Sequence, residues 1–268
     1  MQEIFEFGGS KIYYLDIGKG NTIVLLHGFG EDSQIWNRQI ALLSQNYRLI
    51  VPDLPGSGNS SMLSTPDTIE AYATAIEALL NHLSVNKCII LGHSMGGYIT
   101  LAFAEAYPER LLGWGLIHST AFADSEEKKL NRQRGIELMQ QYGAYAFLRN
   151  TIPNLFAESF KKQEPEVLDQ LIESAKAFTA EACCAYYKAM QLRPDRTQVL
   201  SGSKTPVLFV LGTEDVAAPL NDLLQQVHLP STAYIHILDG VGHMGMLEAT
   251  KKVNAHVAEF AADIFKAQ

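Results

Sequence analysis

Apolar residues are distributed along the chain in two alternating patterns. Short, nearly continuous apolar runs alternate with longer segments in which apolar residues return every three or four positions. The runs are typical of strands buried on both faces, and the longer segments of amphipathic helices. This alternation favours a parallel sheet, because each helix carries the chain back to start the next strand in the same direction.

The predicted strands lie on both sides of a long helical stretch. Two short runs, 4–7 and 11–17, are joined by Gly8 and Gly9 and predict an opening hairpin. The other strands are expected at 22–27, 47–52, 87–91, 112–117, 206–211 and 233–238. Helices are expected at 33–43, 68–83, 95–106, 220–227 and 249–265. The expected fold class is therefore α/β, with a mostly parallel, twisted, eight-stranded sheet flanked by helices.

The strand pattern stops between residues 120 and 199. This stretch is helical and charged, and Pro153, Pro165 and Pro194 interrupt it. We predict that 120–199 forms a helical cap inserted into one α/β core, which consists of 1–119 and 200–268.

The overall composition is that of an ordinary globular protein. The chain has 268 residues, of which 47% are hydrophobic, and a formal net charge of −8. A negative protein repels phosphate backbones and anionic lipid surfaces, so we expect a small-molecule substrate and no nucleic acid or membrane partner. No apolar run reaches the roughly 20 residues of a membrane-spanning helix, and residues 1–7 lack the pattern of a secretory signal.

The three cysteines favour a reducing compartment. Cys88 lies in a predicted strand and Cys183 is adjacent to Cys184, an odd count without the spacing of a disulfide framework. We therefore expect a cytoplasmic location. The sequence carries no signal for an oligomeric state.

The strongest chemical motif is GHSMGG at 92–97. It stands directly after the strand expected at 87–91 and directly before the helix expected at 95–106. In this context a G-x-S-x-G sequence forms a strained strand-to-helix turn that pushes the serine hydroxyl out of the sheet, and the flanking glycines permit the close backbone approach. The motif predicts Ser94 as a nucleophile.

A serine hydroxyl needs a neighbouring base, and that base needs a carboxylate to orient it. Two late loops supply both: Asp215 follows the strand expected at 206–211, and His243 follows the strand expected at 233–238. The carboxyl ends of parallel strands meet at one edge of a sheet, so these loops are expected to converge with Ser94.

Other residues compete for the role of the acid. Glu214 is adjacent to Asp215, Asp239 precedes the histidine loop, and Asp124 follows the strand expected at 112–117. Asp215 is favoured because it lies several residues past the strand end, on a loop long enough to reach back to the histidine.

Backbone donors for a developing oxyanion are also expected near Ser94. The N–H of Met95 begins a helix, and the N–H of Phe29 lies in a glycine-bracketed turn after the strand expected at 22–27. His27 and His93 are expected to structure the loops beside the site. The remaining histidines are expected on the surface or packed, namely His82, His118, His228, His236 and His256.

The chain closely resembles the α/β-hydrolase superfamily. The resemblance is carried by HGFG at 27–30, DLPGSGNS at 53–60, GHSMGG at 92–97, GTED at 212–215 and GVGHMGMLE at 240–248. It extends in particular to small capped bacterial members, which include carboxylesterases, haloperoxidase-like perhydrolases and carbon-carbon bond hydrolases. The resemblance implies a triad of Ser94, Asp215 and His243, and oxyanion donors at Phe29 and Met95.

The expected activity is cleavage of an ester of a small soluble acyl substrate through an acyl-enzyme. No cofactor is expected, and no group of residues shows the spacing of metal ligands. A dinucleotide site at Gly28, Gly30 and Ser33, with Asp53 as the ribose acid, is disfavoured because it leaves the serine motif and both late loops unexplained.

Two other functions stay open. One is a carbon-carbon hydrolase of a keto-acid, which uses the same triad and needs a cation such as Arg149 or Arg193 to hold the anion. Both arginines are expected to be exposed on helices. The other is a ligand receptor with low turnover.

Side chains around the serine motif and in the cap are expected to set specificity, although an aromatic residue at helical spacing is more often part of the core. The candidates are Trp36, Tyr98, Phe122, Phe147, Phe156, Tyr186 and Met244.

Overall fold

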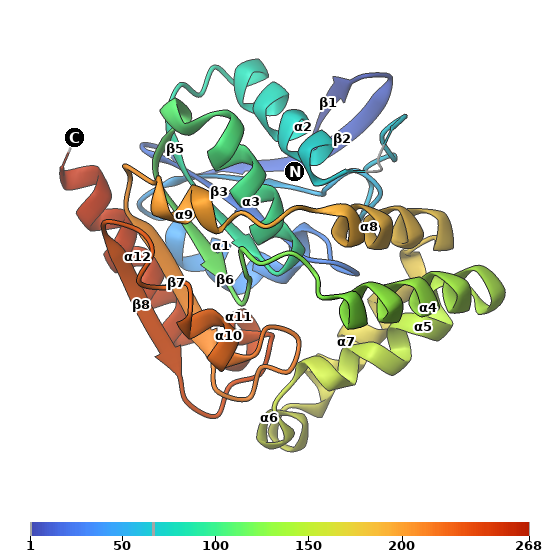
Figure 1. Cartoon of the computed structure of the whole chain (residues 1–268). Coiled ribbons are helices and arrows are strands. Elements are labelled where there is room, and N and C mark those ends of the chain that lie inside the picture. Colours follow the sequence, from blue (N-terminus) through green and yellow to red (C-terminus); the bar gives the residue numbers. More distant parts are fainter. Residues whose placement is uncertain (1, 66–67, 268) are drawn as a thin grey trace.

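An eight-stranded sheet runs through the molecule (Figure 1). The computed structural model describes residues 2–65 and 68–267. The strand order is β1-β2-β4-β3-β5-β6-β7-β8, in which β1, β2 and β4 pair antiparallel and all later pairs are parallel. The strands are β1 (Glu3–Phe7), β2 (Ser10–Ile17), β3 (Thr22–Leu26), β4 (Arg48–Pro52), β5 (Cys88–His93), β6 (Leu111–Ile117), β7 (Val207–Gly212) and β8 (Ala233–Leu238). This arrangement confirms the predicted fold class.

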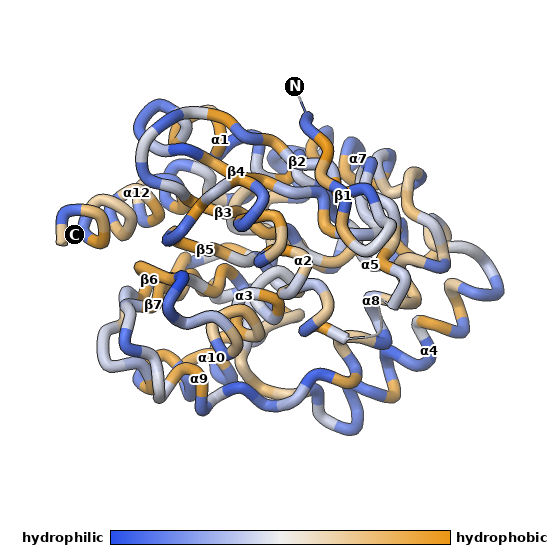
Figure 2. Tube along the Cα trace, turned by 90° about the horizontal axis from the view of Figure 1, so that it is seen from above, coloured by the Kyte–Doolittle hydropathy of each residue, from blue (hydrophilic) through white to orange (hydrophobic). Residues whose placement is uncertain are grey.

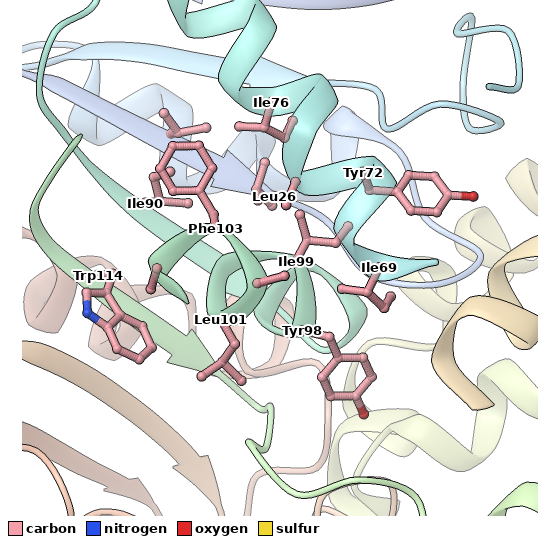
Figure 3. Close-up of a cluster of buried hydrophobic side chains, with 14 of the residues drawn as sticks. Leu26, Ile69, Tyr72, Ile76, Ile90, Tyr98, Ile99, Leu101, Phe103 and Trp114 are labelled. Atoms are coloured by element: carbon pink, nitrogen blue, oxygen red, sulfur yellow. The ribbon is translucent and has the colours of Figure 1, made fainter. Parts of the chain in front are cut away.

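Helices cover both faces of the sheet. One face carries α2 (Ile69–His82) and α3 (Met95–Ala106), and the other carries α1 (Asn37–Leu43) and α12 (Thr250–Lys266). Because successive side chains of a strand point to opposite faces, each strand contributes to both layers. Leu26 of β3 lies in the cluster under α2 and α3 (Figure 3). Val24 belongs to the same cluster, and Leu25 belongs to the opposite one. Figure 2 shows the resulting concentration of hydrophobic residues on the central strands.

A helical segment separates β6 from β7. Its helices are α4 (Glu126–Tyr142), α5 (Ala144–Thr151), η3 (Ile152–Leu155), α6 (Glu158–Gln163), α7 (Pro165–Ser174), η4 (Ala175–Ala177), α8 (Ala180–Leu192) and α9 (Thr197–Ser201). Most of these helices lie to one side of the sheet in Figure 1. The division into a core and a cap at 120–199 stays a prediction. The predicted core includes four residues outside the described ranges, namely Met1, Pro66, Asp67 and Gln268.

Several predicted boundaries differ from the structure. The helix expected at 33–43 is divided into a short 3-10 helix, η1 (Ser33–Trp36), and α1; Asp32 caps η1 by accepting the Gln34 N–H at 2.9 Å. The helix expected at 220–227 ends early, as α10 (Leu220–Leu224). Two short helices were not predicted, η2 (Pro108–Arg110) and α11 (Gly245–Glu248).

No helix within the described ranges is long and apolar enough to cross a lipid bilayer.

Phe103 anchors α3 against the sheet, and its side chain is fully buried. We expect Phe103→Ala to lower the free energy of unfolding by about 3–5 kcal/mol, because a large cavity forms beneath the helix that follows Ser94. Urea denaturation measures the loss. Tyr142→Ala removes a ring that is 62% exposed and is the control, with an expected change within about 0.5 kcal/mol. Equal effects of the two substitutions would contradict this packing.

Candidate active site

Ser94 occupies the turn between β5 and α3 in a strained conformation. Its φ of 51° lies in the left-handed region, which non-glycine residues rarely adopt. The turn is held from both sides: the Ser94 N–H donates to the Ile117 carbonyl at 3.0 Å, and the Ser94 carbonyl accepts from Ser119 Oγ at 2.7 Å. The backbone is therefore fixed while the half-buried side chain stays outside these hydrogen bonds.

The glycines two positions before and after Ser94 are needed because a side chain at either position would collide with the backbone. A Cβ atom on Gly92 would lie 2.2 Å from the carbonyl carbon of Gly96, and one on Gly96 would lie 2.4 Å from the Leu26 oxygen. Strand, turn and helix thus approach more closely than any side chain allows, as the sequence motif predicts.

Asp215 and His243 lie on the loops that follow β7 and β8, and they meet. The Nδ1 atom of His243 is 3.0 Å from Asp215 Oδ1 and 2.9 Å from Oδ2. Both side chains are buried, at 0% exposure for the carboxylate and 5% for the imidazole. Among the described residues, the hydrogen bonds of the ring use Nδ1, so Nε2 is left to act on another group.

The charged forms of both residues are stabilised by each other. Burial acts to raise the pKa of Asp215, but the charge of His243 and hydrogen bonds from His118 and His243 hold that pKa well below its usual range. Burial likewise acts to lower the pKa of His243, but the charge and hydrogen bond of Asp215 raise it above its usual value. An imidazolium that forms here during a reaction is therefore stabilised by Asp215.

His118 also contacts the carboxylate. Its Nδ1 is 3.0 Å from Asp215 Oδ2, and its ring is fully buried. The expectation of a surface or packed histidine missed this hydrogen bond. One signal was available, since His118 directly follows the buried strand β6 at the edge of the sheet where the other loops converge.

A second histidine–carboxylate pair lies beside the first. Glu31 Oε2 is 3.0 Å from His93 Nδ1 and accepts the Gly28 N–H at 2.7 Å, and His93 Nε2 is 3.0 Å from the carbonyl oxygen of His243. The carbonyl can only accept, so Nε2 donates. Although burial acts to raise the pKa of Glu31, the charge and hydrogen bond of His93 lower it below its usual value. This agrees with the expected loop-structuring role of His93.

The histidine loop is tied to the helical segment. The N–H of His243 donates to the carbonyl of Leu155 at 2.7 Å. Glu248 accepts N–H groups from Gly242 at 3.1 Å, Met244 at 3.0 Å and Ala157 at 2.9 Å. The loop that presents the imidazole is thus held by hydrogen bonds on both of its flanks.

The two candidate oxyanion donors lie beside the turn. Met95 is the first residue of α3, so its N–H has no partner within the helix. Phe29 lies in the loop after β3, where a Cβ on neighbouring Gly28 would be 3.1 Å from the Cβ of Ser94. The loop is therefore in contact with the serine turn.

Three candidate substrate contacts are fully buried. Trp36 packs edge-on against His93 with ring centroids 6.4 Å apart, and Met244 is buried in the same cluster. Tyr186 donates its hydroxyl to the Pro55 carbonyl at 2.7 Å. These positions support packing around the site.

The other candidates lie in the helical segment or face it. Tyr98, one turn beyond Ser94 in α3, lies under the Arg193 guanidinium at 3.8 Å. Phe122 and Phe147 are half-buried, whereas Phe156 is buried and stacks on Phe160 at 5.5 Å. Their contact with a substrate stays a prediction.

The expected exposure is right for Arg149 and wrong for Arg193. Arg149 is exposed, but Arg193 is buried because it pairs with Asp124 at 2.8 Å and donates to the Met190 carbonyl at 2.7 Å. Arg132 pairs with the same aspartate. Two guanidinium groups therefore share one carboxylate close to Tyr98.

Outside the Asp215–His243 site, three side chains with atoms that could bind a metal ion lie close together, which the sequence spacing did not predict. His236 of β8 lies with His256 and Glu259 of α12, with their ligand atoms within 4.8 Å of one another. The two rings stack with centroids 3.7 Å apart and an interplanar angle of 15°, so their lone pairs lie in two nearly parallel planes rather than in one plane around an ion. This geometry does not favour a metal centre.

Comparison with known proteins identifies the family. The model of the α/β-hydrolase fold family matches residues 21–250. A thermophilic esterase from Thermogutta terrifontis, solved with malate bound, shares 30% identity, covers 98% of this chain and 99% of its own, and superposes with a TM-score of 0.92. The chain therefore belongs to the α/β-hydrolase family and is an enzyme of that class.

Other relatives differ in their named activities. A 2-hydroxy-6-oxononadienedioate/2-hydroxy-6-oxononatrienedioate hydrolase from Burkholderia vietnamiensis is 28% identical, over 93% of this chain and 90% of its own length. The enol-lactonase from Burkholderia xenovorans LB400 has a TM-score of 0.90 at 24% identity, with coverage of 97% and 100%. The latter supports the fold alone.

The Glu31–His93 pair gives a pH-dependent contribution to stability. Because the pKa of Glu31 is lowered on folding, its contribution is complete above the unfolded value, about 4.3, and is lost as the pH falls through and below it. We expect Glu31→Gln to cost about 3–5 kcal/mol at pH 7, since it leaves a buried partner uncompensated, and up to about 0.6 kcal/mol less at pH 4. Urea unfolding at the two pH values measures the difference.

The matched control for this measurement is Glu127→Gln, because Glu127 is exposed on α4. A loss for Glu31→Gln that stays the same at both pH values would show that its charge does not contribute.

Proposed function

We propose that this enzyme is a serine hydrolase that cleaves esters of small acyl substrates. The observation that carries the proposal is the buried Asp215–His243 pair at 2.9–3.0 Å, with His243 Nε2 free, at the same edge of the sheet as the strained Ser94 turn. These are the parts that nucleophilic acyl transfer needs: a nucleophile, a base and a carboxylate that orients the base.

The proposed reaction has two halves. His243 Nε2 accepts the Ser94 proton as the hydroxyl oxygen attacks the ester carbonyl, and Asp215 stabilises the imidazolium. The N–H groups of Phe29 and Met95 bind the oxyanion. The alcohol leaves with the proton from His243, and a water molecule then attacks the acyl-enzyme by the same route. Each step uses groups of the chain and requires no cofactor.

Two further assignments belong to this proposal. The segment 120–199 acts as the cap that bounds the acyl pocket, with Phe122 and Phe147 as its half-buried aromatic residues. The three cysteines are free and buried, which supports the proposed cytoplasmic location.

Ser94→Ala tests the nucleophile. We expect wild-type protein to hydrolyse p-nitrophenyl acyl esters and the variant to lose turnover by roughly 10³ to 10⁶, the range seen when a triad loses a member. A chain-length series of esters, followed by p-nitrophenolate release, measures both the loss and the size of the acyl pocket.

Ser61→Ala is the matched control, because it removes a hydroxyl from an exposed loop that contacts Lys11. Turnover by Ser94→Ala at the wild-type rate would reject the proposal. A well-folded wild-type protein without ester turnover would shift the weight to carbon-carbon cleavage or to ligand reception.

A second candidate function is hydrolysis of a keto-acid. The observation that favours it is the surplus of positive charge where Arg132 and Arg193 share Asp124 beside Tyr98. The relative from Burkholderia vietnamiensis is named for dienedioate substrates, which are anions. A carboxylate on the substrate would complement the unshared guanidinium charge.

Arg193→Gln separates the two functions. If the substrate is an anion, the variant should raise KM for a 2-hydroxy-6-oxo-dienoate by roughly 10- to 150-fold, the value of one charged hydrogen bond of about 1.5–3 kcal/mol, and leave the KM of a neutral ester unchanged. Steady-state kinetics on both substrates measures this. Arg134→Gln, exposed on α4, is the control. Equal effects on both substrates would assign Arg193 to packing.

A further inference from the structure

The proposed reaction gives no role to His118, although this residue is placed with unusual constraint. Its ring is fully buried and its φ is 51°, in the left-handed region. Such a conformation costs of order 1–3 kcal/mol and persists only where the surroundings hold it. Its N–H is held by the Val210 carbonyl at 2.9 Å.

His118 completes the hydrogen bonding of the catalytic carboxylate. Asp215 Oδ1 accepts the N–H groups of Ala217 at 2.9 Å and Ala218 at 2.8 Å, whereas Oδ2 is 2.9 Å from His243 Nδ1 and 3.0 Å from His118 Nδ1. Among the described residues, His118 is the only side chain besides His243 that donates to this carboxylate. Without His118, Oδ2 would keep only its hydrogen bond with His243.

The surroundings fix the tautomer of His118. Because Nδ1 donates to Asp215, Nε2 carries the lone pair, and this atom is buried with no hydrogen-bond partner among the described residues. A Cβ atom on Gly245 would lie only 2.3 Å from that Nε2. A side chain at position 245 would therefore collide with the His118 ring, so Gly245 leaves the space that the imidazole fills.

We propose that His118 is a positioning residue that fixes the Asp215 carboxylate and shares its negative charge with His243. The inference rests on the proposed function, because it assigns His118 to the same reaction. Substitution of His118 should alter the base, His243, without removing a contact to the substrate.

The expected effect on the base follows from the charge. The donated N–H draws negative charge from Asp215, so its loss makes the carboxylate a stronger partner for the imidazolium and raises the pKa of His243 further. Burial lowers the pKa of His118 below its usual value, which favours its neutral form. The other titratable groups that face this site are Glu31, His93 and Glu248, and they are unchanged in the variants below.

The test compares His118→Gly with His118→Asn. Glycine accepts the left-handed φ and removes the donor. Asparagine also tolerates that φ, and its amide N–H can replace Nδ1–H. The pH dependence of kcat/KM for a p-nitrophenyl ester and the 15N NMR titration of the His243 ring are measured for both variants and for wild type.

For His118→Gly we expect the acid limb of kcat/KM to move up by roughly half to one pH unit, with kcat at the plateau lowered by about tenfold and KM little changed. Free imidazole should restore the wild-type limb by filling the vacated slot. His118→Asn should keep the limb in place. A merely structural role would lower kcat in both variants without moving the limb.

The NMR titration separates this inference from the proposed function. If the protein does not cleave esters, the His243 ring should still titrate at higher pH in His118→Gly than in wild type. If His118→Gly does not fold, Gly245→Ala displaces the ring from Asp215 and should move the titration in the same direction. A His243 titration unchanged in a folded variant of either kind would overturn the inference.

Discussion

The carboxylate of Asp215 must be buried and ionised at the same time, and the site is arranged around that requirement. An uncompensated charge in the protein interior costs several kcal/mol. The cost is offset here by two backbone N–H groups and two imidazoles. The loop after β7 supplies the amides, and the ends of β6 and β8 supply the rings. The parallel strands are therefore constrained at their carboxyl ends, where three separate loops must converge on one side chain.

The same principle appears a second time around Glu31. Its carboxylate accepts the Gly28 N–H and pairs with His93, and the other nitrogen of that ring binds the carbonyl of His243. The loop that carries Phe29 and the loop that carries His243 are thereby joined through a single imidazole. A polar network that is satisfied in this way gives rigidity, whereas a partly satisfied one would destabilise the fold.

The sequence predicted the sheet and the residues of the candidate triad because both leave local patterns. Buried strands give continuous apolar runs, and the turn at Ser94 needs glycines two positions away on each side. The partners of the triad leave no such pattern. Glu31 and His118 acquire their roles through contacts with residues far along the chain, and the burial of Arg193 depends on its approach to Asp124. All three are polar residues that follow a strand or helix: Glu31 lies in the loop after β3, His118 directly follows β6 and Arg193 directly follows α8.

The hydrogen bond from the His243 N–H to the Leu155 carbonyl has a consequence for how this enzyme can diversify. Exchange of the segment between β6 and β7 is an obvious route to new specificity in such a fold, since the sheet itself need not change. In this chain, hydrogen bonds between the segment and the histidine loop limit which replacements are possible. Any replacement must present a carbonyl oxygen to His243 and an amide to Glu248 at the positions of Leu155 and Ala157. This constraint falls on the stretch near η3, which must match the histidine loop, and these hydrogen bonds place no such demand on α4 or α7.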